Sequence, residues 1–339
     1  ALLLAGGLLG PQACAARGGG GVPEPRGTPP APPSGVMATQ AAAAGATLSA
    51  DPSPLVQAAL THLDSQAGAL VTELAGTLEQ DPSDGYRWLD LCLALYSHTV
   101  IDLAEDCFWQ AALRLDQDGR PPYFLARIQE RSGQPRAALD LYQEAMDRAP
   151  NQDWLRWRAG FAALALGDLD RAQADFDAAL QASPGLTAAL AGAARVALQR
   201  GDAQKAVDLL QGVQGDTQDE ATSLAQILAT AYQRLGRAEE AAALRASLGP
   251  KAQAEEPWTD PWQQEVGKFA TGFGVAMQQV AAMLAADQVD QAIATLEALL
   301  AQHEERDEVY LRLGTAYGMK GDFERARAAF NTVADKSSA

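Results

Sequence analysis

A recurring pattern of helix signals, with a period of about 34 residues, constrains the fold of this chain more than any other feature. Its clearest copy is residues 153–186, which predict two short amphipathic helices separated by a turn at Gly167-Asp168. The second helix is expected to stop before Pro184, because the residue before a proline avoids helical backbone angles. Phe176 lies between small alanines, which favours two closely packed antiparallel helices. A single hairpin of this kind cannot bury its outer faces, so it needs neighbours.

The same phase continues along the chain, and it is typical of helix–turn–helix arrays. It predicts a helical cap or degenerate repeat over 51–84, five repeats over 85–250, a loop and helix start over 251–272, and two further repeats over 273–339. The loop contains Trp258 and Trp262 between prolines, and these tryptophans are expected to pin it to the surface of the array.

The repeats resemble tetratricopeptide repeats, and the exported bacterial proteins of that family in particular. The last unit carries the pattern almost throughout, at Tyr310, Leu313-Gly314, Tyr317, Gly321-Asp322, Ala326 and Phe330. The resemblance covers roughly residues 85–339. It implies an all-α solenoid of helix–turn–helix repeats that forms a right-handed superhelix and binds other proteins.

Residues 1–50 differ from the repeats, because a short apolar stretch precedes glycine- and proline-rich sequence that predicts an extended arm. Ala13-Cys14-Ala15 fits a signal-peptide cleavage site, so the segment is either a signal remnant or an arm of the mature protein. Both interpretations agree with an extracytoplasmic protein, either extracellular or periplasmic. A lipid anchor on Cys14 is a further alternative. A retained arm is expected to lie along a neighbouring copy of the chain, with apolar anchors at Leu2, Leu3, Leu4, Leu8 and Leu9.

Composition limits the function. The chain has 43 acidic against 26 basic residues, a formal charge of −17, which argues against a nucleic-acid partner. No stretch reaches the roughly 18 apolar residues of a membrane span. The three histidines, His62, His98 and His303, have no ligand spacing and are interpreted as structural residues. We find no catalytic, phosphate-binding or metal-binding motif, and therefore predict no enzyme activity, cofactor or metal.

Cys92 and Cys107 lie on the two predicted helices of the first full repeat. In an exported protein they could form a disulfide. The predicted register does not place them directly opposite each other, which favours two buried thiols.

The first helices of the repeats carry arginine and aromatic residues where such repeats form a groove. These residues are Tyr123, Arg127, Arg131, Trp154, Trp157, Arg158, Phe161, Arg195 and Arg234. Arginine and tryptophan dominate binding hot spots, and arginine pairs with carboxylates. The stripe therefore predicts a groove for an extended segment with carboxylates and apolar anchors. Equally, these arginines could pair with acidic residues of neighbouring helices. The asparagines of the carboxylate-clamp repeats that bind chaperones are absent.

Two functions follow from the sequence. The first is a non-catalytic exported scaffold for protein–protein interaction in a multiprotein, polymeric extracellular assembly, with a c-type cytochrome or copies of itself as partners. The second is a periplasmic or lipid-anchored assembly factor of the pilus or secretion pilot type.

Overall fold

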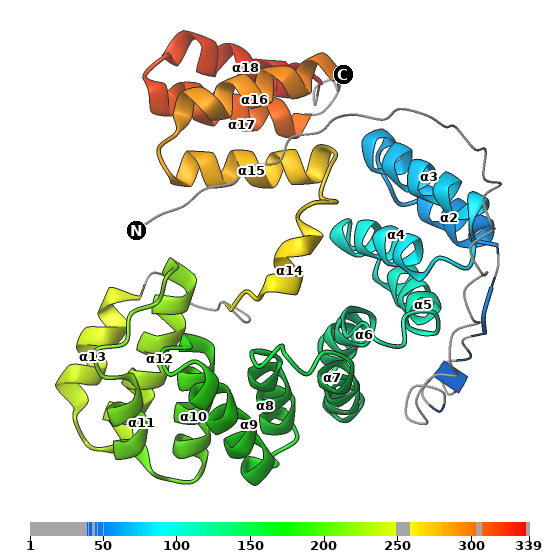
Figure 1. The fold of residues 1–339 in the computed structure, drawn as a ribbon. Helices are drawn as coiled ribbons and strands as arrows, with labels where there is room; N and C mark the ends of the chain where they lie inside the picture. The colour runs from blue at the N-terminus through cyan, green and yellow to red at the C-terminus, as the bar shows by residue number, and fades with distance from the viewer. Residues whose placement is uncertain are drawn as a thin grey trace, which may run out of the picture. The chain divides into compact units, whose positions relative to one another are not determined.

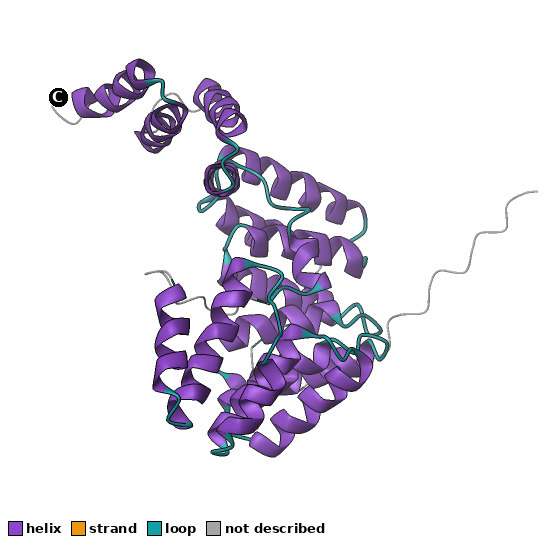
Figure 2. Cartoon of the chain, turned by 90° about the vertical axis from the view of Figure 1, so that its left-hand side faces the viewer, coloured by secondary structure: helices purple, strands orange, loops and turns teal. Residues whose placement is uncertain are grey.

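The computed structural model describes residues 51–248, 258–302 and 307–336, together with a few residues between 39 and 49. These residues form seventeen helices and no strand (Figure 1, Figure 2). Among them, no helix combines the length and apolar character that a membrane crossing requires. The predicted all-α class is confirmed. The expected arm anchors, Leu2 to Leu9, together with Cys14 and His303, lie outside the described residues.

Consecutive helices pack in pairs, and the array opens with α2 (Ser53–Leu60) and α3 (Ser65–Gln80). The next five pairs are α4 (Gly85–Ser97) with α5 (Ile101–Ala112), α6 (Arg120–Arg131) with α7 (Pro135–Arg148), α8 (Leu155–Ala165) with α9 (Leu169–Ala182), α10 (Thr187–Gln199) with α11 (Ala203–Leu210), and α12 (Gln218–Arg234) with α13 (Ala238–Ser247). The short α14 (Pro261–Val266) follows. The last pairs are α15 (Phe273–Ala285) with α16 (Val289–Gln302) and α17 (Asp307–Lys320) with α18 (Phe323–Lys336).

Glycine and aspartate together set the turn within several pairs. Gly167, Gly201 and Gly321 have φ angles of 76°, 85° and 84°, in the left-handed region where glycine has no steric penalty. The aspartates that follow the first two glycines, Asp168 and Asp202, each accept a hydrogen bond from an N–H group in the first turn of the next helix. The Gly-Asp signal therefore marks both the end of one helix and the start of the next.

One pair contacts the next through large and small side chains. Phe176 on α9 is 0% exposed. Its ring lies against Gly160 on α8 and Gly192 on α10, where added Cβ atoms would come within 2.7 Å and 2.2 Å of ring carbons. Two glycines thus form the slot that holds this ring between successive pairs.

The hairpin α4–α5 contains a disulfide between Cys92 and Cys107, whose Cα atoms are 5.2 Å apart. The register argument that favoured two thiols was wrong. The two residues lie at similar distances from the α4–α5 turn, so they stand at nearly the same height on the paired helices. Both side chains are fully buried.

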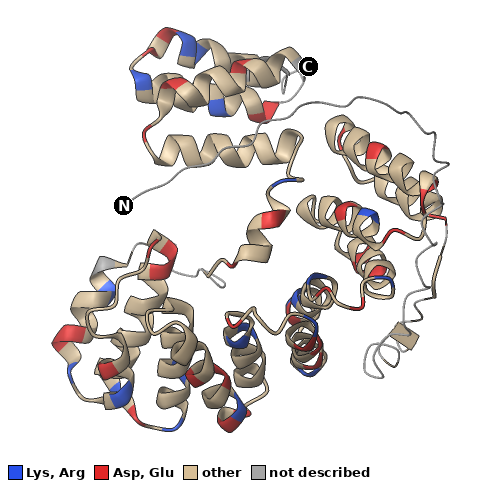
Figure 3. Cartoon of the chain, in the orientation of Figure 1, with Lys and Arg blue, Asp and Glu red and all other residues tan. Residues whose placement is uncertain are grey.

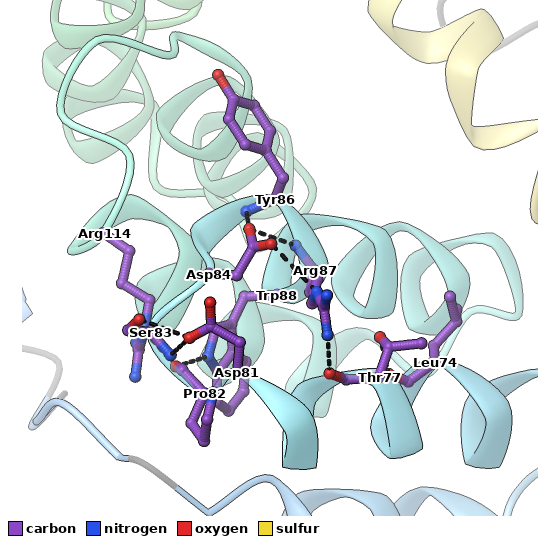
Figure 4. Close-up of polar contacts among 10 residues, drawn as sticks. All are labelled: Leu74, Thr77, Asp81, Pro82, Ser83, Asp84, Tyr86, Arg87, Trp88 and Arg114. Carbon is purple, nitrogen blue, oxygen red and sulfur yellow. Dashed lines mark hydrogen bonds and ion pairs between the residues drawn. The ribbon is translucent and has the colours of Figure 1, made fainter. Parts of the chain in front are cut away.

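The junction between α3 and α4 fastens the first pair to the array (Figure 4). Asp84 caps α4 by accepting hydrogen bonds from N–H groups of its first turn. The Arg87 guanidinium donates to the Thr77 carbonyl oxygen on α3. The Trp88 indole N–H donates to the Pro82 carbonyl oxygen at 3.0 Å. Residues 51–84 are therefore packed as part of the helical array.

Candidate partner-binding groove

The predicted groove residues all lie on, or next to, the first helices of their pairs. The structure places Tyr123, Arg127 and Arg131 on α6, Trp154 directly before α8, Trp157, Arg158 and Phe161 on α8, Arg195 on α10, and Arg234 on α12. The residues from α6 and α8 come together, and a later part of the same chain covers several of them.

That covering segment centres on Asp260, which is 2% exposed. Its Oδ2 accepts hydrogen bonds from the Tyr123 hydroxyl at 2.6 Å and from Nε and Nη2 of Arg158 at 3.0 and 2.8 Å. Arg158 Nη2 also donates to the Trp258 carbonyl oxygen at 3.1 Å. The other carboxylate oxygen of Asp260 accepts from the Gln263 N–H at 2.9 Å and caps α14. The Asp260–Arg158 ion pair is thus buried, and each of its two side chains has further hydrogen bonds.

Aromatic rings surround this ion pair. The Trp262 ring packs edge-on against Trp154 and Tyr123, with centroid distances of 5.2 Å in both cases. The Arg158 guanidinium lies 4.0 Å from the centroid of the Trp157 ring. Trp258 and Trp262 are both buried. The tryptophans therefore hold the loop against the array, and they do so on the predicted groove residues.

Further contacts extend along residues 258–273, which we call the strap. Arg120 Nη1 pairs with Oε2 of Glu265 at 3.1 Å, and the Ser97 hydroxyl donates to the Phe269 carbonyl oxygen at 3.2 Å. The Phe273 N–H donates to Oδ2 of Asp64 at 2.7 Å. Because Asp64 also caps α3, the strap reaches from α8 to the first pair of the array.

Burial shapes the protonation of the groove residues. It raises the pKa of the Tyr123 hydroxyl well above its ordinary value, so this group stays a neutral donor to Asp260. Burial and nearby Arg127 oppose the charge of Arg158, but the Asp260 carboxylate helps to hold the pKa of this guanidinium above its ordinary value. A charged Arg158 therefore requires an acceptor in this position.

A pocket lies between α6, α8 and α10, and no residue of the strap is among its lining residues. It has a volume of about 600 Å³, and its lining combines apolar side chains of α8 with polar groups of α6 and α10. The Arg195 guanidinium stands 5.4 Å from the centroid of the Phe161 ring and donates to the Ser223 hydroxyl at 3.2 Å. Residues that line the pocket include Glu130, Pro135, Phe161, Leu164, Arg195 and Gln199. We call this cavity the Phe161–Arg195 pocket.

A second pocket brings together two histidines that are distant in sequence. His62 and His98 line it beside the start of α5. Burial lowers the pKa of the His98 imidazole, although the nearby Asp64 carboxylate opposes this. In the described part of the chain, no three metal-ligating side chains gather at one place.

Comparisons with known proteins identify the repeats. Two sequence models described as "Tetratricopeptide repeat" match this chain, one over residues 163–227 and 283–337 and the other over residues 123–185. The chain is a tetratricopeptide repeat protein. A comparison with curated proteins gives no match.

Several solved structures are similar to this tetratricopeptide repeat protein. A fragment of MamA from Desulfovibrio magneticus RS-1 has 16% identity, with 48% of this chain and 91% of that chain covered and a TM-score of 0.43. YrrB, a "TPR protein with an unusual peptide-binding site", has 19% identity, coverages of 62% and 97%, and a TM-score of 0.40. A tetratricopeptide repeat protein from Parabacteroides merdae has 14% identity, coverages of 74% and 92%, and a TM-score of 0.41.

Local pairing, the alternative that the sequence left open, accounts for part of the arginine stripe in this tetratricopeptide repeat protein. Arg127 Nη1 pairs with Oε2 of Glu130 on the same helix at 2.6 Å. Arg234 donates to the Leu198 carbonyl oxygen of the preceding pair. Arg131 is exposed. The stripe is thus divided among local pairs, the strap and the Phe161–Arg195 pocket.

The residue that sequence reasoning missed is Asp260. It stands between two tryptophans and before a proline. This combination indicated that the loop packs on the array, but it did not indicate which residues the loop contacts. The predicted features of a groove ligand, a carboxylate with apolar anchors, are those of the strap itself. Tyr123, Trp157 and Arg158 are buried in this structure and therefore do not present a free surface to a partner.

Proposed function

We propose that this chain is an exported, non-catalytic scaffold, and that a segment of a partner protein binds in the Phe161–Arg195 pocket. Tetratricopeptide repeat proteins generally mediate protein–protein interaction. The observation that carries the proposal is that Phe161 and Arg195, both predicted from sequence as binding residues, line a pocket that the strap leaves uncovered.

The pocket's chemistry defines the segment that it would hold. Phe161, Leu164 and Pro135 offer apolar contact. The Arg195 guanidinium can donate to a carboxylate, and charge-assisted bonds of this kind are about twice as strong as neutral ones. A partner segment with an apolar side chain beside an acidic residue fits this arrangement, and the strap shows the same combination where it binds Tyr123, Trp154 and Arg158.

Export is the second part of the proposal. The buried Cys92–Cys107 disulfide supports it, because disulfides persist in oxidising compartments and are rare in the cytosol. Within this proposal the scaffold belongs to a polymeric extracellular assembly, with a c-type cytochrome or further copies of the chain as partners. That narrower version is based on resemblance to exported proteins of the family.

Site-specific photocrosslinking tests the pocket. A benzophenone amino acid in place of the exposed Gln199, in native cells, should form one defined crosslinked product with a partner. Arg195→Glu and Phe161→Ala should each remove this product. The matched control is Arg131→Glu, an exposed charge reversal that does not line the pocket. A product that survives both pocket substitutions would refute the pocket as the binding site.

Intact-mass measurement of the native protein tests export separately. We expect a protein outside the cytoplasm with Cys92 and Cys107 oxidised. A lipid on Cys14 would instead favour the lipid-anchored assembly factor. A cytoplasmic protein with both thiols reduced would contradict export and leave the pocket proposal untouched.

A further inference from the structure

The strap meets the array as a short continuous segment in a fitted groove. Its main contacts come from Trp258 to Trp262, whereas the groove is built from α6, α8 and the residues just before them. Arg158 and Tyr123 hold the carboxylate of the strap. The Trp262 ring has its own place beside Gly119, where an added Cβ would come within 2.9 Å of the ring. The groove therefore recognises a linear segment with an aspartate two residues before a tryptophan.

The strap belongs to the core of the array, while the helices after it have a core of their own. Trp258, Trp262 and Val266 are buried in the same apolar cluster as residues of α2 to α12. A second cluster begins at Phe273, the last residue of the strap, and its described residues all lie on α15 to α18. Figure 3 shows that charge also changes here, because α14 and the segment after it carry charged residues and α15 carries none. The strap can therefore leave the groove without opening the core of the last two pairs.

The bound strap leaves two of its polar groups unsatisfied. The Trp258 indole N–H and the side-chain oxygen of Gln263 are buried and have no hydrogen-bond partner among the described residues. Burying a polar group without a partner costs free energy, and so does moving the charges of Asp260 and Arg158 out of water. All of these groups regain water when the strap opens. Release therefore costs less than the burial of two tryptophans alone would indicate.

We propose that copies of this chain pair by exchanging straps, so that the groove of one copy binds the strap of another. The occupant is the segment that the structure shows to fit this groove. Exchange keeps every contact of the strap, because the second copy presents the same residues in the same order, and exchange of identical elements is a low-cost route to dimers. The Phe161–Arg195 pocket has no part in this contact, so the inference stands independently of the proposed function.

Concentration decides which strap fills the groove. A segment that is tethered close to its binding site has an effective concentration in the roughly millimolar range. The strap of the same copy therefore fills the groove in dilute solution. Exchange prevails where copies of the chain are packed at a comparable density, or where the contact within one copy is impaired. Substitutions can impose the second condition.

Complementary charge reversals in the full-length protein provide the test. Arg158→Asp impairs the groove but leaves the strap intact, whereas Asp260→Arg impairs the strap but leaves the groove intact. In an equimolar mixture, the intact strap of the first variant meets the intact groove of the second, and the two reversed charges pair in the other interface. Native mass spectrometry should show dimers with one copy of each variant. Their association constant should exceed that of either variant alone by about 100-fold or more, the effect of breaking a buried ion pair.

Because a reversed charge in a buried place can also disturb folding, a second pair at the edge of the strap repeats the test. The side chains of Arg120 and Glu265 are 25% and 27% exposed. At roughly millimolar protein, a mixture of Arg120→Glu with Glu265→Arg should favour mixed dimers over same-variant dimers by about two- to fivefold, the range for a surface ion pair.

The matched control is Arg131→Glu, an exposed reversal on α6 that makes none of the strap contacts described above. Mixed with Glu265→Arg, it should give no excess of mixed dimers. Monomers in both complementary mixtures, or dimers that form regardless of which charges are paired, would overturn the proposal.

Discussion

Replacing Asp260 with alanine tests whether the strap stabilises the array. The substitution removes the carboxylate that balances Arg158, whose side chain is 1% exposed. It also removes the acceptor of the Tyr123 hydroxyl and the cap of α14. Breaking a buried ion pair on one side destabilises a protein by about 3–5 kcal/mol, and loss of a helix cap by about 1 kcal/mol. The strap can detach and return Arg158 to water, so we expect a total loss of about 3–5 kcal/mol.

Urea denaturation followed by circular dichroism measures this loss, and tryptophan fluorescence reports whether Trp258 and Trp262 become exposed. Asp260→Asn is the matched variant, since asparagine keeps the cap but removes the charge, and its loss should be smaller. A double-mutant cycle with Arg158→Leu should give a coupling of about 1–3 kcal/mol between the two residues. A loss below about 1 kcal/mol for Asp260→Ala, or additive effects in the cycle, would refute the role given to this ion pair.

Further predictions test other features. Gly192→Ala should destabilise the protein by about 1–3 kcal/mol, because the added Cβ would lie 2.2 Å from the buried Phe176 ring. Gly76→Ala is the control: the space around Gly76 is open, so this substitution should stabilise the protein by about 1 kcal/mol. Equal shifts of the two melting temperatures would contradict the glycine slot around Phe176. Burial and neighbouring acidic residues raise the pKa of Glu105, so its ionised form is disfavoured in the folded state. Glu105→Gln should therefore raise the free energy of unfolding at pH 7, and this gain should disappear as the pH falls through the unfolded pKa of about 4.3. Reduction of the Cys92–Cys107 disulfide, with a sequence separation of 15, should lower stability by about 3 kcal/mol, and unchanged unfolding curves with and without reductant would argue against the bond.

Local signals predicted the helical pairs, because each turn is encoded by neighbouring residues. Gly167 and Asp168, for example, determine the turn and the cap that join α8 to α9. The disulfide was misjudged because the register of two predicted helices is uncertain by a residue or two, which is enough to decide whether side chains meet.

The strap could not be placed from the sequence for a different reason. Asp260 and Arg158 are 102 residues apart. No local sequence signal around either residue indicates that the other is its partner. The sequence did indicate that the Pro–Trp loop packs on the array and that Arg158 seeks a carboxylate. Only the fold shows that Asp260 of this loop is the carboxylate that pairs with Arg158.

The strap also changes how the repeats depend on one another. In a linear repeat array each unit contacts only its neighbours, and the ends can fray separately. Here single hydrogen bonds join residues that are 137 and 209 positions apart, at Tyr123–Asp260 and Asp64–Phe273. If the two ends of the array were pulled apart, the force would act on these long-range contacts before it acted on the repeats between them. The molecule should therefore lengthen in one abrupt step, when these contacts break, rather than gradually.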